Sequence, residues 1–430
     1  MTTNKDRSKD TEVPYHGRTM PLHLPPQAQL TTIRPQQPKV GTPWEEHLSV
    51  YWSSAEWTSL LTKAHGKTML VVVNDATRAT PTALLLRKLV PLLHEQDVIP
   101  RFIVATGSHR PPTQEELKVI LGDYYDQYHA RTLVHDAKDD ANLTFVGETS
   151  FGTPVWVNKV LLDEEVGGVV AVNSVEPHYF AGWTGGRKSI IPGIAGYQTI
   201  TATHKHALEP TSQTCKLDGN PVHDDFMECF DLIVGAAQKP ITSFQFIIDS
   251  EGVIHDLVSG HPTEALTEAV AQAGPIFQSI IPHKFDLVIA VATPPLDQNL
   301  YQAHKGLENT KLATKEGGDI LLVASCWDGV GPDSFLEPLQ SDLLNHPTLL
   351  LAEIREHYKL GYHKAAKLVE GAERYHIALL SELPDEVTEM TLFRPVHDLQ
   401  QWVEERLEGK DSPEVLVVYD ACLTVPTLET

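Results

Sequence analysis

Polar residues that could do chemistry gather in three clusters, each directly after a short apolar run. The first cluster is NDATRATP, residues 74–81. Within it, Asp75 and Arg78 can orient each other, and the Arg78 guanidinium can then hold a carboxylate or a phosphate in two-pronged fashion. A helix N-cap with a surface ion pair would account for the same residues. The cluster therefore indicates either an anion site or an ordinary helix start.

The second cluster, ATGSHRP at residues 105–111, places a histidine directly after a strand-end turn. Gly107 lets backbone N–H groups approach a ligand closely, and His109 would project beyond the end of the strand. Most histidines in a chain with 21 of them are incidental, but this position favours a functional role. We therefore take His109 as a candidate site residue.

The third cluster runs EPHYFAGWTGGRKSIIPG over residues 176–193 and is followed by THKH at 203–206. Its Gly-Gly-Arg-Lys-Ser segment is similar to a phosphate-binding loop. However, GxxxxGK[ST] requires a glycine directly before the lysine, where Arg187 stands. No GxGxxG follows a predicted strand either. The pattern therefore argues against an NTPase and against a nicotinamide-dependent dehydrogenase.

Three histidines of this region, His178, His204 and His206, invite comparison with a zinc site. No HExxH motif accompanies them, and no carboxylate lies between residues 177 and 208. A zinc- or other metal-dependent hydrolase or lyase that uses these histidines stays open as the enzyme alternative. A non-catalytic protein that binds a nucleotide or a hydroxy acid is the other alternative.

Two later segments are less specific. In YQAHKG, residues 301–306, a helix would place Tyr301 and Lys305 on one face, where they offer a hydroxyl and an ammonium to a substrate. An ordinary helix start, with Glu308 paired to a neighbouring lysine, explains the same residues. The segment GNPVHDD, residues 219–225, is a turn into a helix, for which a structural role is sufficient.

Alternating strands and helices must position these clusters. Strands are predicted at 69–75, 101–107, 167–175, 285–293, 317–325, 375–383 and 414–421, with helices at 80–96 and 113–122. This alternation predicts the α/β class, with two α/β domains built on largely parallel sheets. Because ligands bind beyond the carboxyl ends of such strands, we expect the active site in the cleft between the two domains.

The domain boundaries follow from shifts in composition. We expect a polar N-terminal tail over residues 1–40 that wraps the surface or stays partly disordered. A first α/β domain over 41–280 would bind any cofactor, with its rejoining by residues 410–430 left open. A second α/β domain would cover residues 281–409.

Composition excludes several classes of function. The chain of 430 residues has 34 Lys+Arg against 57 Asp+Glu, a formal net charge of −23, so its surface should repel nucleic acid. No apolar run approaches the roughly 20 residues that span a bilayer, and the N-terminus lacks the apolar segment of a secretory signal. The four cysteines form no CxxC pair, which argues against a zinc cluster or a disulfide framework. We expect a cytoplasmic globular protein with no nucleic-acid or membrane partner.

Taken together, the motifs DATR, TGSHR, EPHYFAGWTGGRKSIIPG, the His204 region, GNPVHDD and YQAHK, in that order, resemble the nickel-dependent lactate racemase family. The resemblance covers about residues 70–310. It implies an isomerase, a racemase or epimerase that inverts C2 of a 2-hydroxy acid. It also implies a nickel-pincer nucleotide, Ni(II)-pyridinium-3,5-bisthiocarboxylic acid mononucleotide, and transient contact with the enzymes that synthesise this cofactor.

The resemblance also assigns roles to individual residues. Lys188 would carry the cofactor covalently and His204 would bind nickel, with His206 as a nearby alternative. His109 and His178 would be acid and base on opposite faces of the substrate. The remaining assignments are Asp75, Ala76, Thr77 and Arg78 to the cofactor, and Arg78, Tyr301, Gln302 and Lys305 to the substrate.

These residue types suit the implied chemistry. The C2–H bond of a hydroxy acid is too weakly acidic for a histidine alone, so it would leave as hydride while a histidine takes the hydroxyl proton. Family members that act on lactate also carry a tryptophan in the second domain, for which Tyr362 and Trp327 are the candidates here. The substrate therefore stays open among lactate, malate, 2-hydroxyglutarate, phenyllactate and sugar acids.

Overall fold

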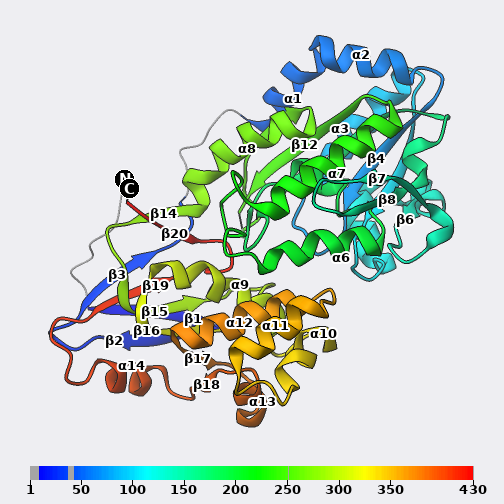
Figure 1. The fold of residues 1–430 in the computed structure, drawn as a ribbon. Helices are drawn as coiled ribbons and strands as arrows, with labels where there is room; N and C mark the ends of the chain where they lie inside the picture. The colour runs from blue at the N-terminus through cyan, green and yellow to red at the C-terminus, as the bar shows by residue number, and fades with distance from the viewer. Residues whose placement is uncertain (1–8, 37–42, 250, 430) are drawn as a thin grey trace. The chain divides into compact units, whose positions relative to one another are not determined.

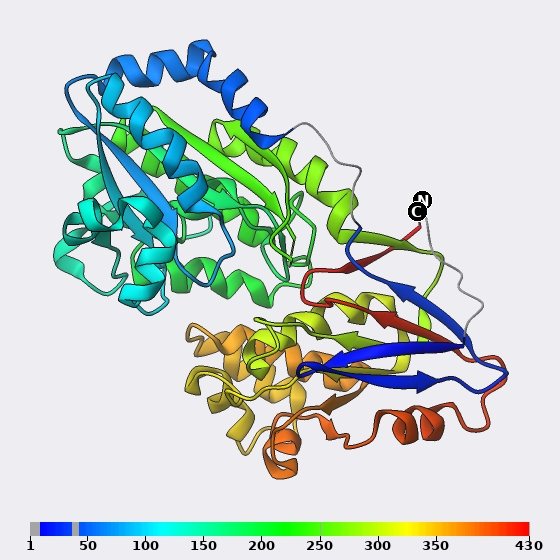
Figure 2. The ribbon, with the colours of Figure 1, turned by 180° about the vertical axis from the view of Figure 1, so that it is seen from behind.

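The computed structural model describes residues 9–36, 43–249 and 251–429. The chain divides into two units, shown from opposite sides in Figures 1 and 2. Residues 38–274 form one, which we call the central unit. Residues 1–37 and 275–430 form the other, which we call the terminal unit. The division falls shortly before the predicted boundary at 280/281.

The central unit is built on a six-stranded sheet in the order β13-β12-β9-β4-β5-β6. Only β12 and β13 pair antiparallel, and the other neighbours are parallel. The strands of this sheet are β4 (Thr68–Asn74), β5 (Ile99–Ala105), β6 (Leu133–Val134), β9 (Val166–Ser174), β12 (Ile241–Ile248) and β13 (Ile254–Gly260). Two antiparallel hairpins accompany it, β7 (Leu143–Glu148) with β8 (Pro154–Asn158) and β10 (Pro177–His178) with β11 (Gly182–Trp183).

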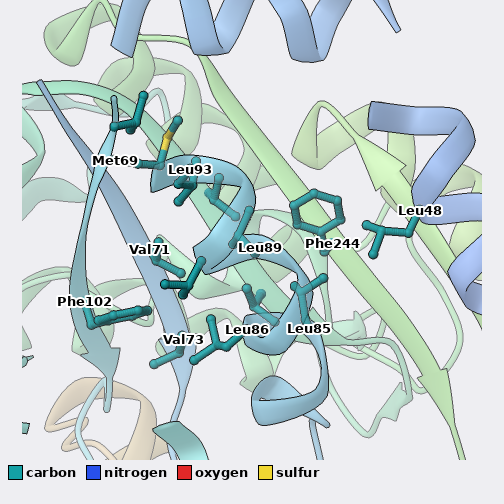
Figure 3. Close-up of a cluster of buried hydrophobic side chains, with 14 of the residues drawn as sticks. Leu48, Met69, Val71, Val73, Leu85, Leu86, Leu89, Leu93, Phe102 and Phe244 are labelled. Carbon is teal, nitrogen blue, oxygen red and sulfur yellow. The ribbon is translucent and has the colours of Figure 1, made fainter. Parts of the chain in front are cut away.

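Helices complete the central unit and bury both faces of β4, whose Met69–Val73 segment has no exposed surface. The helices are α1 (Trp44–Trp52), α2 (Ala55–Ala64), α3 (Thr82–Glu95), α4 (Gln114–Leu121), α5 (Tyr125–Tyr128), α6 (Tyr197–Lys205), α7 (Pro221–Ala237) and α8 (Pro262–Phe277). Figure 3 shows the apolar side of α3, from Leu85 to Leu93, packed toward Val71 and Val73 of β4. This packing fixes the start of α3 beside the end of β4.

The terminal unit has a second six-stranded sheet, in the order β18-β17-β16-β15-β19-β3, in which all neighbours are parallel. Its strands are β3 (Gln29–Ile33), β15 (Phe285–Val291), β16 (Thr314–Val323), β17 (His376–Leu380), β18 (Arg394–Pro395) and β19 (Glu414–Val418). Outside this sheet, β1 (Asp10–Tyr15) pairs with β2 (Arg18–His23), and β14 (Gln278–Ile281) pairs with β20 (Val425–Leu428). Its helices are α9 (Leu300–Thr310), α10 (Asp333–Leu336), α11 (Pro347–Glu356), α12 (Tyr362–Arg374), α13 (Asp385–Met390) and α14 (Leu399–Leu407).

The expected α/β class with two largely parallel sheets is confirmed. Each of the seven predicted strands is present, and α4 begins at a capping box in which Thr113 and Glu116 bond each other's backbone N–H groups. The prediction did not include the other strands, among them β12 and β13 of the central sheet. No helix in the described part of the chain is long and apolar enough to cross a membrane.

The N-terminal residues differ from the expected tail. Residues 10–33 contribute three strands, and β3 pairs with β19 at the edge of the terminal sheet. An edge strand has a neighbour on one side only, so QLTTI shows no continuous apolar run and is hard to recognise. Residues 1–8 and 37–40 of the expected tail lie outside the described residues. Strands β19 and β20 belong to the terminal unit, so residues 410–430 do not rejoin the central one.

Candidate active site

The three polar clusters meet at one edge of the central sheet. Strands β4, β5 and β9 are parallel neighbours, with Asn74 opposite Ala105 and Val73 opposite Val172. Their carboxyl ends therefore lie side by side, and the three clusters follow these ends directly. The sheet register alone brings together residues that are about a hundred positions apart.

His109 is held by Asp75. The Nδ1 atom of His109 lies 2.7 Å from Oδ2 of Asp75, while Oδ1 accepts hydrogen bonds from the backbone N–H and the hydroxyl of Thr77. Burial raises the pKa of Asp75, but the hydrogen bond to His109 and the further donors outweigh it, so the pKa lies below its usual value. A buried, ionised Asp75 thus orients His109, whose side chain stays 48% exposed.

Arg78 pairs with a residue that the sequence did not single out for a role. Its Nη1 donates to Oε1 of Glu176 at 2.6 Å, so its ion-pair partner is Glu176 rather than Asp75. Glu176 stands directly before Pro177 and His178. An acidic residue just after a predicted strand is the sequence feature that could have identified it as the partner of Arg78. The ion pair ties the first cluster to the third.

His178 lies in the small hairpin of β10 and β11. The backbone N–H of Ala181 donates to its Nδ1 at 3.3 Å, so a neutral ring carries its proton on Nε2. The ring packs edge-on against Phe180, with centroids 4.5 Å apart. Phe180 in turn lies 5.2 Å from the ring of His204. A short chain of ring contacts therefore joins His178 to His204.

His204, in the last turn of α6, and Lys188 lie around one aromatic side chain. The ring of His204 is 5.9 Å from that of Phe226, and the Lys188 ammonium is 6.0 Å from the same ring. Burial, then the charges of Lys188 and His109, lower the pKa of His204 to about 3. A neutral imidazole is the form that binds metal ions. Lys188, His204 and His109 thus share one neighbourhood.

A glycine turn sets the position of Lys188. Gly185 has φ 87° and Gly186 has φ 52°, in the left-handed region. A Cβ atom on Gly185 would lie 2.5 Å from Val175, and one on Gly186 would lie 2.4 Å from the Pro262 carbonyl oxygen. Only glycine therefore allows this turn to pack as it does.

Two further polar residues of these segments have partners of their own. Arg110 is exposed and pairs with Glu116 through two hydrogen bonds of 2.7 and 2.6 Å. His206, the alternative metal ligand, lies 3.2 Å from the buried carboxylate of Asp225. Among the described residues, no three His, Cys, Asp or Glu side chains are grouped to hold a metal ion.

Tyr301, Gln302 and Lys305 lie on helix α9 of the terminal unit, as predicted. Asn299 caps this helix by accepting from the Gln302 N–H at 3.0 Å. The buried Lys364 of α12 lies over the Tyr301 ring, 4.1 Å from its centroid, and was not anticipated.

The two candidates for the family's tryptophan differ in exposure: Trp327 is 61% exposed and Tyr362 is 8% exposed. A hollow of about 480 Å³ in the same unit is lined by Asp319, Trp402 and Arg406 among others. None of the predicted site residues lines it, so we place no chemistry there.

Comparison with known proteins decides the family. A model of the lactate racemase N-terminal domain matches residues 15–215, and one of the C-terminal domain matches residues 281–420. The chain belongs to the lactate racemase family. Neither model alone matches the whole chain, and the two matched segments together include residues of both units.

Two curated members of the lactate racemase family resemble the chain in sequence. The lactate racemase of Thermoanaerobacterium thermosaccharolyticum is 32% identical over 276 residues, 63% of this chain and 62% of that protein. The lactate racemase of Lactiplantibacillus plantarum is 34% identical over 291 residues, 64% of each chain. The matched segments thus span less than two thirds of either relative.

Solved structures extend the likeness to most of the chain. The lactate racemase apoprotein from T. thermosaccharolyticum has a TM-score of 0.83 and 26% identity, covering 97% of this chain and 100% of that one. A Thermotoga maritima protein has a TM-score of 0.67 at 18% identity, covering 84% of this chain and 94% of that one, which shows a likeness of fold alone.

Proposed function

We propose that the protein is a lactate-type 2-hydroxyacid racemase or epimerase, an isomerase that inverts C2. The observation that carries the proposal is that Lys188 and His109 lie near the buried His204, which Phe180 joins to His178. The curated lactate racemases that the chain resembles support the same reaction.

A nickel-pincer nucleotide fits the residues of this edge. His204 offers a neutral imidazole for nickel because burial keeps its pKa low. Lys188 offers an amine for covalent attachment on a turn that its glycines fix. The segment from Asp75 to Arg78 follows the end of β4 and carries the Arg78 guanidinium, which can donate to an anion. When bound, this cofactor would take up and return the C2 hydride.

The protein's own residues would then handle protons and orientation. Asp75 fixes His109 through Nδ1, which leaves Nε2 to exchange a proton with the substrate hydroxyl. His178, with Nδ1 accepting from Ala181, presents Nε2 for the same purpose on the other face. Racemisation requires one such group on each face of a planar intermediate, which explains two histidines from two separate loops.

Arg78 is proposed to hold the substrate carboxylate, and the role of Lys305 toward the substrate stays a prediction from the resemblance. A fixed cation holds the carboxylate in one place while either face of C2 is turned toward the cofactor. The substrate would be a small 2-hydroxy acid. A dicarboxylate such as malate fits this proposal as well as lactate does. We further propose a cytoplasmic location, where cofactor-synthesis enzymes would load the protein transiently.

The test uses protein produced together with cofactor-synthesis enzymes. Intact mass and metal analysis should give an adduct at Lys188 and about one nickel per chain, and Lys188→Ala should lack both. His204→Ala should lose nickel, whereas His206→Ala should largely keep it.

Activity is measured as loss of optical purity of lactate, malate, 2-hydroxyglutarate, phenyllactate and gluconate. His109→Ala and His178→Ala should each lower the rate by about 10²–10⁴-fold. His357→Ala, an exposed histidine of the terminal unit, is the matched control. Parental rates in both His109→Ala and His178→Ala would contradict the proposed mechanism.

A further inference from the structure

His135 is a buried histidine beside the second polar cluster. It directly follows β6, where Val134 pairs with Val104 of β5, and it is 2% exposed. Its backbone N–H donates to the carbonyl oxygen of Val104 at 3.1 Å, and its own carbonyl oxygen accepts from the Thr106 hydroxyl at 2.5 Å. Thr106 stands three positions before His109. The backbone of His135 is therefore held on both sides by the start of the loop that carries His109.

The side chain of His135 bonds a different segment. Its Nε2 lies 2.9 Å from the carbonyl oxygen of Ala195, and a carbonyl only accepts, so Nε2 carries the proton. Its Nδ1 lies 3.2 Å from Nδ2 of Asn158, whose Oδ1 accepts from the Val160 N–H. Burial lowers the pKa of His135, although the bond to Ala195 opposes this effect. The ring is therefore a neutral link in one tautomer, with both nitrogens bonded to protein atoms.

The segment that His135 bonds joins two residues of the candidate site. Residues 190–196, which we call the connecting segment, follow Lys188 and lead into α6, the helix that carries His204. The backbone N–H of Gly193 donates to the Lys188 carbonyl oxygen at 3.1 Å. A shift of the connecting segment would therefore be transmitted to the backbone of Lys188 and to the start of α6.

Two backbone hydrogen bonds join the same pair of loops. The N–H of Gly107 donates to the carbonyl oxygen of Gly193 at 2.9 Å. The N–H of Tyr197, the first residue of α6, donates to the carbonyl oxygen of Ala137 at 2.7 Å, two positions after His135. The His135 side chain adds a third link between these segments, and it is the link that a substitution can remove while the backbone donors and acceptors stay in place.

We propose that His135 is a positioning residue that sets the placement of His109 relative to Lys188 and His204. It acts through Thr106 on one side and Ala195 on the other. The Ala195 carbonyl is buried, and a buried acceptor that loses its donor is costly, so the connecting segment would move to regain a partner. The role in catalysis rests on the proposed racemase function, because small displacements of reacting groups slow a reaction.

The first test compares turnover per bound nickel. His135→Phe keeps a ring of similar shape and loses both side-chain hydrogen bonds. We expect kcat divided by nickel content to fall about 10- to 100-fold, as expected when reacting groups are misplaced. KM should change little, because Arg78 keeps its partner Glu176. A histidine with a merely structural role would lower the fraction of folded, loaded protein and leave the turnover of each loaded molecule unchanged.

Three further variants sharpen this test. His135→Gln, whose amide can donate to Ala195, should recover part of the turnover. Thr106→Val removes the hydroxyl that bonds the His135 carbonyl. Its effect should combine with that of His135→Phe less than additively in free energy, because both act on one link. His94→Phe is the matched control, since His94 also bonds a neutral partner in the central unit, the Tyr128 hydroxyl at 2.9 Å, and its turnover per nickel should equal that of the parent.

Amide hydrogen exchange gives a second readout that needs neither cofactor nor activity. In protein made without cofactor, segments 104–110 and 190–197 should both exchange faster in His135→Phe than in the parent, and at the parental rate in His94→Phe. Faster exchange in a parent protein that does not racemise would uphold the link and contradict the proposed function instead. Parental turnover per nickel in His135→Phe, or unchanged exchange in the two segments, would overturn the proposal.

Discussion

His109 Nδ1 and Asp75 Oδ2 lie 2.7 Å apart, although 34 residues separate them in sequence. Asp75 follows β4 and His109 follows β5, so the parallel register of the two strands creates the contact. Because Asp75 is also bonded to Thr77, its carboxylate has little freedom, and the imidazole that it holds is fixed in turn.

Replacing Asp75 should reduce activity without removing the fold. In Asp75→Asn the amide cannot stabilise a protonated His109, and it favours a different tautomer of the ring. We expect the racemisation rate to fall by about 10²-fold or more, the lower range for an acid–base group. Steady-state rates with lactate or the best substrate check this. Asp126→Asn, which removes an exposed carboxylate, should stay at the parental rate.

The ion pair of Arg78 and Glu176 predicts a split between two kinetic constants. Arg78→Met should raise KM about 10–100-fold, as expected for a lost hydrogen bond to a charged group of about 1.5–3 kcal/mol. Glu176→Gln should change KM in the same direction but less, because an amide oxygen still accepts from Nη1. Arg101→Met serves as control, since Arg101 pairs with Asp163 at the same 2.6 Å. A drop in kcat alone in Arg78→Met would contradict a role in carboxylate binding.

The glycine turn before Lys188 can be tested against a matched glycine. Gly186→Ala places a Cβ atom 2.4 Å from a backbone oxygen, whereas Gly152→Ala, at φ 79°, meets nothing within 4 Å. Both variants bear the cost of a positive φ, on the order of 1 kcal/mol. Only Gly186→Ala should displace Lys188 and lose the cofactor adduct in intact mass. Equal adduct yields in the two variants would show that the turn does not position Lys188.

His223 predicts a loss of stability in acid. Its pKa in the folded protein is about 3, against about 6.5 in an unfolded chain. The unfolded chain therefore binds more protons in this window, and the free energy of unfolding falls as the pH drops from about 6.5 toward 3.

His223→Gln should flatten that part of the pH dependence. Urea unfolding of the parent and the variant at pH 7 and pH 4.5 measures the effect. His357→Gln, at an exposed site, should leave the slope unchanged. Parallel pH profiles for parent and His223→Gln would mean that His223 is accessible to protons in the folded state.

Local patterns in the sequence were enough to predict the strands and helices that carry the site residues. Two of the strands at the site, β4 and β9, are β-branched apolar runs buried over most of their length. The capping box at Thr113 and the helix through Tyr301 and Lys305 also follow from short-range spacing. Such features depend on neighbours within a few residues, which the sequence displays directly.

Long-range pairing was decided only by the tertiary structure. Glu176 reaches Arg78 from 98 positions away. Strand β3 pairs with residues near the other end of the chain, at β19. The burial of Arg187 beside α7 depends likewise on how the 185–189 turn packs onto that helix. No local pattern records such contacts, because each depends on sheet order and packing that arise when distant segments are brought together.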